Sequence, residues 1–467
     1  MSRLREIFFC AILLLCFSAN NAKAQAVLEI TSSNITTGVP VSATATNTIG
    51  MPSGLIGGIL GGLLSIVIKG TLTNDFTTPS SILPAISTNV GSVGTSLLSS
   101  STPYTLDQLL HTTQTMYSAT ISLESAQATI QYQIPQAKMA SYAWVAGNYI
   151  NTSLSYTAGT LLSSKTSTPT LTLIVDPFIN FQSTPRPVTH TVDNLNYYRG
   201  TPLSGTTTFI NQYTVPLNIA VSATKATLDY TPLYSGAAAV STTVSYITAN
   251  LSSPSVGSGK NLSTSYQNVS PGGISIPVGN KQSSTITYSI SSTNLKAGFL
   301  QAGDYITNIN YQASDASATP SASPAQVLSV PFTVHVDTLS ALELSTQNIS
   351  LSFNNASDYT NGVDTTIQGH LTLSSTVACS VTVSATSSAL TNGSNSIPLD
   401  CVSIGVNGSS QSVNLSTTPQ TIISGITPVI DQPLNITYSI PKSKVSEMLG
   451  KPPGTYTTQL VYTLTAP

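Results

Sequence analysis

Few residues in this 467-residue chain could do chemistry, and they do not gather into a reactive set. The histidines are scattered through the sequence without neighbouring metal ligands: His111, His190, His335 and His370. There is no G-x-S-x-G elbow, phosphate-binding glycine loop or zinc-ligand spacing. Asp358, Asn361 and Asp364 carry oxygen ligands without EF-hand spacing, so a solvated turn is expected there. The sequence therefore predicts a protein that is not an enzyme and uses no metal or cofactor.

The first 24 residues have the pattern of a cleaved signal peptide. Arg3 and Arg5 precede an apolar run over residues 7–17, and Ala22-Lys23-Ala24 gives an A-x-A cleavage pattern before Gln25. The run is too short to cross a bilayer comfortably, which takes about 20 apolar residues. We therefore expect an exported chain, secreted or on the cell surface, with a Gram-negative envelope as its setting.

Two cysteines remain once such a leader is removed, Cys379 and Cys401. In an oxidising compartment the simplest interpretation is one disulfide that ties two strands of the last domain together. A zinc site would need four ligands, and no histidine clusters with this pair.

Charged residues form only 7% of the chain, whereas about 25% is typical. Ser, Thr and Asn fill the polar positions instead, and the net charge of −2 provides no basic surface. This composition argues against nucleic acid as a partner.

One motif occurs three times and has the pattern of a β-strand. It reads T-I-Q-Y-Q-I, T-I-T-Y-S-I and N-I-T-Y-S-I around Tyr132, Tyr288 and Tyr438. Large apolar residues alternate with small polar ones, so one face is expected to pack and the other to meet water. A short segment such as residues 441–449 comes after each copy and predicts one or two helical turns.

A second motif, Gly-x-Tyr, comes after each copy at a similar distance. It is formed by the pairs Gly147 and Tyr149, Gly303 and Tyr305, and Gly454 and Tyr456. The glycine predicts a tight turn and the tyrosine a strand start, where its ring packs and its hydroxyl reaches the backbone. This arrangement resembles the tyrosine corner of immunoglobulin-like sandwiches.

The repeats predict an all-β fold of three tandem immunoglobulin-like sandwiches. The predicted domains are residues 25–171, 172–339 and 340–467. The Ala/Ser/Pro stretch over residues 313–325 has the composition of a linker near the second boundary.

The third copy differs from the other two in the segment after it. Strand-like segments at residues 170–176 and 330–337 come after the first two copies, whereas the sequence stops at Pro467 after the third. Either those segments are inter-domain strands that need no counterpart, or the third sandwich has an open edge that would accept a strand from another chain.

These features together resemble those of bacterial fimbrial and surface-fibre subunits. The features are the leader, the low charge, the cysteine pair and the final strand with Gly454, Tyr456 and Tyr462. That class includes chaperone–usher pilins and spore-coat-U-like domains, whose subunits polymerise by donating strands. This chain carries three units where a pilin has one or two.

The most unusual segment is glycine-rich and apolar, over residues 51–70. A buried helix or strand of the first domain, a docking surface for a partner, and membrane insertion are the alternatives. The segment is short for a membrane span, so insertion is disfavoured.

We therefore predict a structural or adhesive protein of the cell surface or matrix, such as a pilus-like fibre component that assembles by strand-edge pairing. Its partners would be other surface or fibre proteins, including further copies of itself. The alternative is a glycan-binding surface protein, for which Tyr142 with Trp144 and Tyr197 with Tyr198 are the candidate platforms.

Overall fold

The computed structural model describes eleven stretches of the chain: residues 25–47, 64–72, 87–95, 99–100, 107–108, 113–121, 126–159, 164–255, 257–317, 324–409 and 411–466. The predicted signal peptide lies outside these residues. No helix among them is long and apolar enough to cross a membrane.

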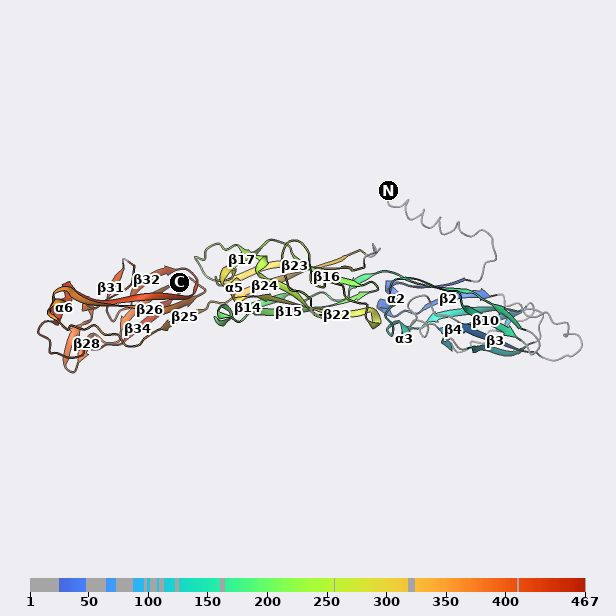
Figure 1. Ribbon diagram of the computed structural model, residues 1–467, viewed down its shortest axis with the longest axis horizontal. Coiled ribbons are helices and arrows are strands. Elements are labelled where there is room, and N and C mark those ends of the chain that lie inside the picture. The colour runs from blue at the N-terminus through green and yellow to red at the C-terminus, as the bar shows by residue number, and fades with distance from the viewer. Residues whose placement is uncertain are drawn as a thin grey trace, which may run out of the picture.

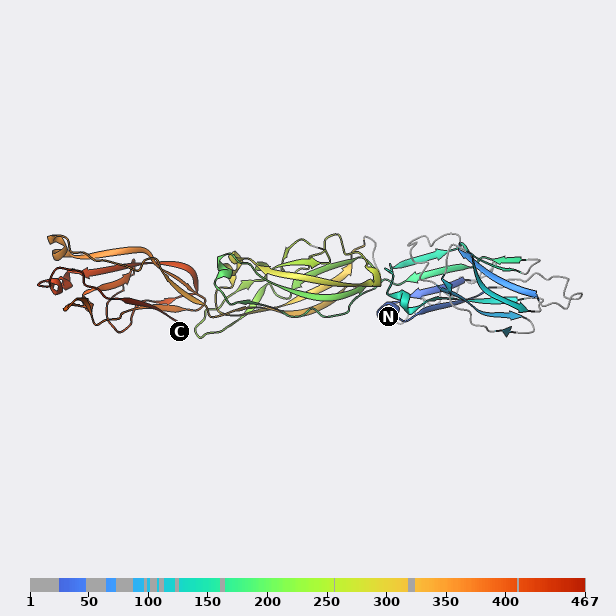
Figure 2. The same cartoon turned by 90° about the horizontal axis from the view of Figure 1, so that it is seen from below.

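The described chain is mostly β-strand, as expected, and its sheets form three groups in a row (Figures 1 and 2). We call these groups the first, second and third sandwich, and they succeed one another in chain order along the long axis of the molecule. The immunoglobulin-like class predicted from the repeats is confirmed by the structure.

The first sandwich runs from β1 to β12. One sheet has the order β1-β12-β9: β1 (Gln25–Ile30), β12 (Thr170–Val175) and β9 (Gly147–Asn151). A second has the order β11-β10-β3-β7: β11 (Ser164–Ser167), β10 (Leu154–Gly159), β3 (Leu64–Leu72) and β7 (Gln114–Ile121). A third has the order β2-β8-β4-β5, with β6 also paired to β4: β2 (Val41–Asn47), β8 (Ala126–Ile134), β4 (Ser87–Thr95), β5 (Ser99–Ser100) and β6 (Asp107–Gln108). Two short helices come after β1 and β8: α2 (Ser32–Thr37) and α3 (Gln136–Met139).

The second sandwich has two larger sheets. One has the order β13-β15-β22-β19-β20: β13 (Ile179–Phe181), β15 (Leu203–Tyr213), β22 (Lys281–Ile290), β19 (Thr248–Ser253) and β20 (Lys260–Asn261). The other has the order β14-β24-β23-β16-β21, with β17 and β18 beside it: β14 (Val188–Val192), β24 (Gln326–Val336), β23 (Gly303–Asp315), β16 (Leu217–Ala223), β21 (Gln267–Asn268), β17 (Thr227–Pro232) and β18 (Thr242–Thr243). Its helical turns are α4 (Asn196–Arg199), η2 (Val244–Tyr246), η3 (Val278–Asn280) and α5 (Ser292–Gly298).

The third sandwich begins with β25. One sheet has the order β25-β26-β33-β30-β31: β25 (Ser340–Leu344), β26 (Gly362–Ser375), β33 (Val429–Pro441), β30 (Ser403–Val406) and β31 (Ser412–Asn414). Another has the order β32-β27-β34: β32 (Gln420–Ile426), β27 (Cys379–Ala385) and β34 (Leu460–Thr465). A hairpin pairs β28 (Ala389–Asn392) with β29 (Asn395–Pro398). The helical turns are α6 (Ala356–Asn361), η4 (Leu399–Cys401) and η5 (Lys442–Met448).

The repeated Thr-Ile-x-Tyr-x-Ile motif forms the inner strand of each sandwich, in β8, β22 and β33. In β22 the side chains of Ile286, Tyr288 and Ile290 are fully buried, while Thr287 and Ser289 face outward. The two-residue alternation therefore decides which face enters the core. The predicted helical turns after the motif are present as α3, α5 and η5.

The predicted boundary between residues 171 and 172 is wrong by a few residues. It cuts through β12, which pairs in parallel with β1 and antiparallel with β9 inside the first sandwich. Residues 170–175 thus form a strand inside the first sandwich and not an inter-domain strand, and residues 330–336 lie in β24 inside the second.

A hydrogen-bonded joint connects the first and second sandwiches. The side chain of Asn280 accepts a hydrogen bond from the backbone N–H of Trp144 (2.9 Å) and donates to the carbonyl oxygens of Trp144 (2.7 Å) and Tyr213 (2.8 Å). Both Asn280 and Trp144 are completely buried. Asn280 has a φ of 57°, a conformation that asparagine tolerates better than most residues.

Candidate functional site at the edge of the third sandwich

The Gly-x-Tyr motif forms the same corner in all three sandwiches. The hydroxyl groups of Tyr149, Tyr305 and Tyr456 each donate a hydrogen bond to the carbonyl oxygen four residues earlier, at 2.8, 2.9 and 2.9 Å. This is the backbone contact expected from the tyrosine-corner pattern. A Cβ at Gly303 would lie 2.5 Å from the Thr231 carbonyl oxygen, so this turn admits only glycine.

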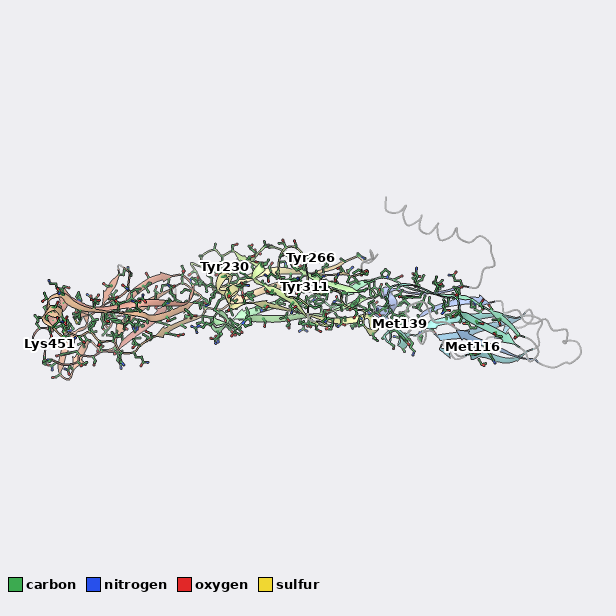
Figure 3. The ribbon with its side chains drawn as sticks, viewed as in Figure 1. Met116, Met139, Tyr230, Tyr266, Tyr311 and Lys451 are labelled. Carbon is green, nitrogen blue, oxygen red and sulfur yellow. The ribbon has the colours of Figure 1, made fainter. Side chains whose placement is uncertain are left out.

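A tyrosine pair faces the core of each sandwich, and sequence reasoning missed it. The hydroxyl of Tyr288 donates to that of Tyr311 (2.9 Å), and Tyr438 and Tyr462 make the same contact. Tyr311 lies in the middle of the second sandwich (Figure 3). In the first sandwich the corresponding residues are Tyr132 and Tyr156, both fully buried. The signal was available, because a second tyrosine comes six or seven residues after the tyrosine of each Gly-x-Tyr motif.

The strand that comes after this motif differs between the sandwiches. In the second sandwich, β24 lies between β14 and β23, parallel to the first and antiparallel to the second. In the first sandwich, β12 lies in the same way between β1 and β9. In each of these two sandwiches, a later strand therefore pairs with the edge of the strand that begins at the Gly-x-Tyr motif.

The third sandwich has no such strand among the described residues. There β34 pairs with β27 alone, so its second edge is unpaired within the part of the chain that the structure describes. Both views place the C-terminal end of β34 at the end of the third sandwich that faces the second (Figures 1 and 2).

Side chains on the inner face of β34 are less covered than their equivalents. In the second sandwich Ile309, Tyr311 and Ala313 are at most 1% exposed. The matching residues of the third are only half-buried: Leu460, Tyr462 and Leu464.

A second half-buried apolar row lies before α6. Ile349, Leu351 and Phe353 alternate with exposed serines and pack against the core of the third sandwich. They match buried side chains of β14, which precede α4 in the second sandwich: Val188, His190 and Val192. β14 is held by its parallel partner β24, whereas residues 349–353 form no strand. We call β34 together with residues 349–353 the open edge.

The open edge offers backbone N–H and C=O groups and apolar side chains, without a charged residue in either segment. An unpaired strand edge is a template for another extended chain, which would supply the missing hydrogen bonds. Alternate side chains of that added chain would cover the half-buried rows. The site therefore suits binding of an extended strand.

The predicted Cys379–Cys401 disulfide is absent, and both residues are buried free thiols. Cys379 lies near Ser375, at the end of β26 where Ser375 pairs with Val429. Cys401 comes directly after Asp400, which is paired with Lys444 of η5, at the opposite end of β26. A strand of 14 residues separates them by roughly 40 Å, and a disulfide needs Cα atoms within about 7 Å.

The described histidines do not form a reactive site. His190 is 2% exposed beside Phe332, and burial lowers its pKa to about 4. His335 contacts Asp304 (2.6 Å) and Asp337 (3.0 Å) on the polar face of β24; these carboxylates raise its pKa, Asp304 most. His370 is buried against the tyrosine pair of the third sandwich, and burial lowers its pKa.

The calcium-like residues have a structural role instead. The carboxylate of Asp358 accepts hydrogen bonds from the backbone N–H groups of Asn354 (2.6 Å) and Asn355 (3.1 Å), which caps α6. Within the described stretches, no group of three His, Cys, Asp or Glu side chains could hold a metal ion.

Each of the two candidate sugar platforms has one buried ring. Trp144 is completely buried, and its indole N–H donates to the Met139 carbonyl oxygen (2.8 Å). Tyr198 is 1% exposed and donates to the Phe299 carbonyl oxygen (2.7 Å). Neither ring can stack on a glycan in this structure.

The glycine-rich segment 51–70 is only partly described. Residues 64–70 belong to β3, whereas residues 51–63 lie outside the described part, as does His111.

No model of a known protein family matches the sequence, and no curated protein matches it. Solved structures do match the fold. CfaE, the adhesive subunit of CFA/I fimbria of enterotoxigenic Escherichia coli, is 12% identical over 68% of this chain and 99% of its own, with a TM-score of 0.32. The CupB6 tip adhesin from Pseudomonas aeruginosa is 10% identical over 64% of this chain and 91% of its own, with a TM-score of 0.27.

Titin domains I67–I69 match 90% of this chain and 87% of their own at 8% identity, with a TM-score of 0.20. Identities at this level concern the β-sandwich fold alone. Fimbrial adhesin subunits are among the solved structures that are similar to this chain.

Proposed function

We propose that this protein is a non-enzymatic component of a cell-surface fibre, and that its third sandwich accepts a β-strand from another subunit. The observation that carries the proposal is the unpaired second edge of β34, where the first sandwich has β11 beside β10 and β12 beside β9, and the second has β24 beside β23. The bound strand would lie between β34 and residues 349–353, as β24 lies between β23 and β14.

The chemistry of the open edge defines the partner. A ladder of main-chain hydrogen bonds supplies affinity, and pockets for alternate side chains supply specificity. The half-buried rows are apolar and uncharged, so the accepted strand should alternate large apolar residues with polar ones. The strand would come from another surface or fibre protein, including a further copy of this chain, outside the cytoplasm of a Gram-negative bacterium.

The second sandwich provides a natural probe. Its β24 has the sequence QVLSVPFTVHV, with Val330, Phe332, Val334 and Val336 buried against β23 and β14. We expect a labelled peptide of this sequence to bind residues 25–467 and to raise the melting temperature of the third sandwich. Fluorescence anisotropy and calorimetry measure the two effects.

A matched control separates strand addition from apolar adsorption. The same peptide with alternate backbone amides N-methylated keeps every side chain but cannot form the ladder, so it should not bind. Equal binding of both peptides would refute the proposal. So would a result in which neither peptide binds, residues 25–467 form a stable monomer, and the third sandwich unfolds cooperatively. Light scattering after size exclusion gives the molar mass.

A further inference from the structure

An ion cluster crosses the joint between the second and third sandwiches. Arg199, the last residue of α4, lies with its Nη2 2.7 Å and its Nε 3.0 Å from Oδ1 of Asp431. The same Nη2 is 3.2 Å from Oε1 of Glu343. The guanidinium belongs to the second sandwich and both carboxylates to the third, so the contact bridges them.

The acidic side of this cluster is held in place. Asp431 has a φ of 55°, and its Oδ1 accepts a hydrogen bond from the hydroxyl of Ser374 (3.0 Å). The backbone N–H of Asp431 donates to the same hydroxyl (2.9 Å). Arg199 lowers the pKa of Asp431, and Lys296 of α5 adds a weaker attraction in the same direction. Two cations of the second sandwich thus face two carboxylates of the third in a chain that has few charges.

The joint also has neutral contacts. The backbone N–H of Ala302 donates to the Thr376 carbonyl oxygen (2.8 Å). The Thr376 hydroxyl donates to the Asp337 carbonyl oxygen (2.7 Å) in the connecting residues 337–339. Ile430 of the third sandwich is half-buried against the core of the second.

The two joints of the chain therefore differ in kind. The first depends on Asn280 and Trp144, which are neutral and 0% exposed. The second has a buried neutral bond between Ala302 and Thr376 and adds to it an ion pair whose side chains are 34% and 36% exposed. Partly exposed ion pairs weaken with salt, because the screening length falls from about 10 Å at 0.1 M to about 3 Å at 1 M. Buried neutral hydrogen bonds have no such dependence.

We propose that Arg199, Asp431 and Glu343 form a salt-sensitive latch that fixes the direction of the third sandwich relative to the second. When the latch opens, the third sandwich pivots about residues 337–339, while the first and second remain one rigid rod. The latch is a property of the chain itself and holds whether or not the open edge accepts a strand.

Spin-label distances test the latch. Ser265→Cys and Thr417→Cys place labels on exposed positions of the second and third sandwiches. Burial raises the pKa of Cys401 to about 11 and also raises that of Cys379, so the native thiols stay unlabelled at neutral pH. We expect one narrow distance distribution at low salt. The width of this distribution should increase at least twofold in 1 M NaCl. The Arg199→Ala variant should show the same increase already at low salt.

Two controls accompany the measurement. Arg186→Ala removes an exposed arginine of the same sandwich and should leave the distribution narrow. Labels at Thr152→Cys and Ser265→Cys report the first joint, whose distribution should not change with salt. A distribution that stays narrow in Arg199→Ala overturns the latch, and so does equal broadening of both joints in salt.

Discussion

Replacing Asn280 by alanine should separate the first and second sandwiches. The substitution removes two buried hydrogen bonds that cross the joint to the backbone of Trp144, and a third to the carbonyl oxygen of Tyr213 within the second sandwich. Each is worth about 1 kcal/mol net. Alanine at a φ of 57° costs about 1 kcal/mol more, so the folded state should lose about 4 kcal/mol in all, about half of it from the two bonds that cross the joint.

Glycine at the same position separates the cost of the lost hydrogen bonds from the cost of the left-handed backbone. Asn280→Gly also loses the hydrogen bonds but accepts positive φ freely, so it should lose about 3 kcal/mol. The difference between the two variants measures the cost of the left-handed backbone. Asn180→Ala, at an exposed asparagine of β13, is the matched control and should change stability by less than about 0.5 kcal/mol.

The sequence supplies its own reporter for this experiment. Trp144 is its single tryptophan and lies in the joint, so its fluorescence in a urea titration tracks the opening of that joint. We expect the fluorescence midpoint to fall in both variants, alanine furthest. An alanine variant within about 1 kcal/mol of the parent would refute the claim that these bonds hold the joint. If alanine and glycine lose equal stability, the left-handed backbone has no measurable cost, and only that part of the prediction is refuted.

Three further outcomes are expected. Because burial holds the pKa of His190 near 4, unfolding takes up a proton as the pH falls from about 6.5 to 4, and the second sandwich should lose about 3 kcal/mol by calorimetry; His190→Leu should abolish this slope, and an unchanged slope would contradict its origin. Tyr305→Phe loses the corner hydrogen bond and should destabilise the second sandwich by about 1 kcal/mol in the same assay, whereas Tyr266→Phe, at an exposed ring, should be neutral. Ellman's reagent should titrate Cys379 and Cys401 as two thiols in unfolded residues 25–467 and react slowly with the folded chain; a disulfide found by mass spectrometry would contradict the structure.

Much of the fold can be predicted from local pattern. Alternation around Tyr288 determines which face of the strand is buried, and this results from the geometry of an extended chain. The Gly-x-Tyr motif similarly predicts the corner at Tyr305, because its hydrogen bond joins residues only four apart. Such features need no knowledge of distant segments, so a single sequence contains them.

The open edge could be predicted only as one of two alternatives. Strand-like segments at residues 170–176 and 330–337 come after the first two motifs, but the sequence alone does not say where those residues lie. The tertiary structure places β12 and β24 inside their sandwiches, each covering the strand before it. Only then does the unpaired edge of β34 become a candidate site.

The sequence by itself determined the strands, the turns and the class of fold, because these depend on side-chain alternation and on residues close together in the chain. The tertiary structure decided that Cys379 and Cys401 lie at opposite ends of one sandwich, and that Arg199 meets Asp431 across a joint. Contacts between distant residues depend on which strand lies beside which. That choice is made by burial over a whole sandwich, which no local pattern in this chain encodes.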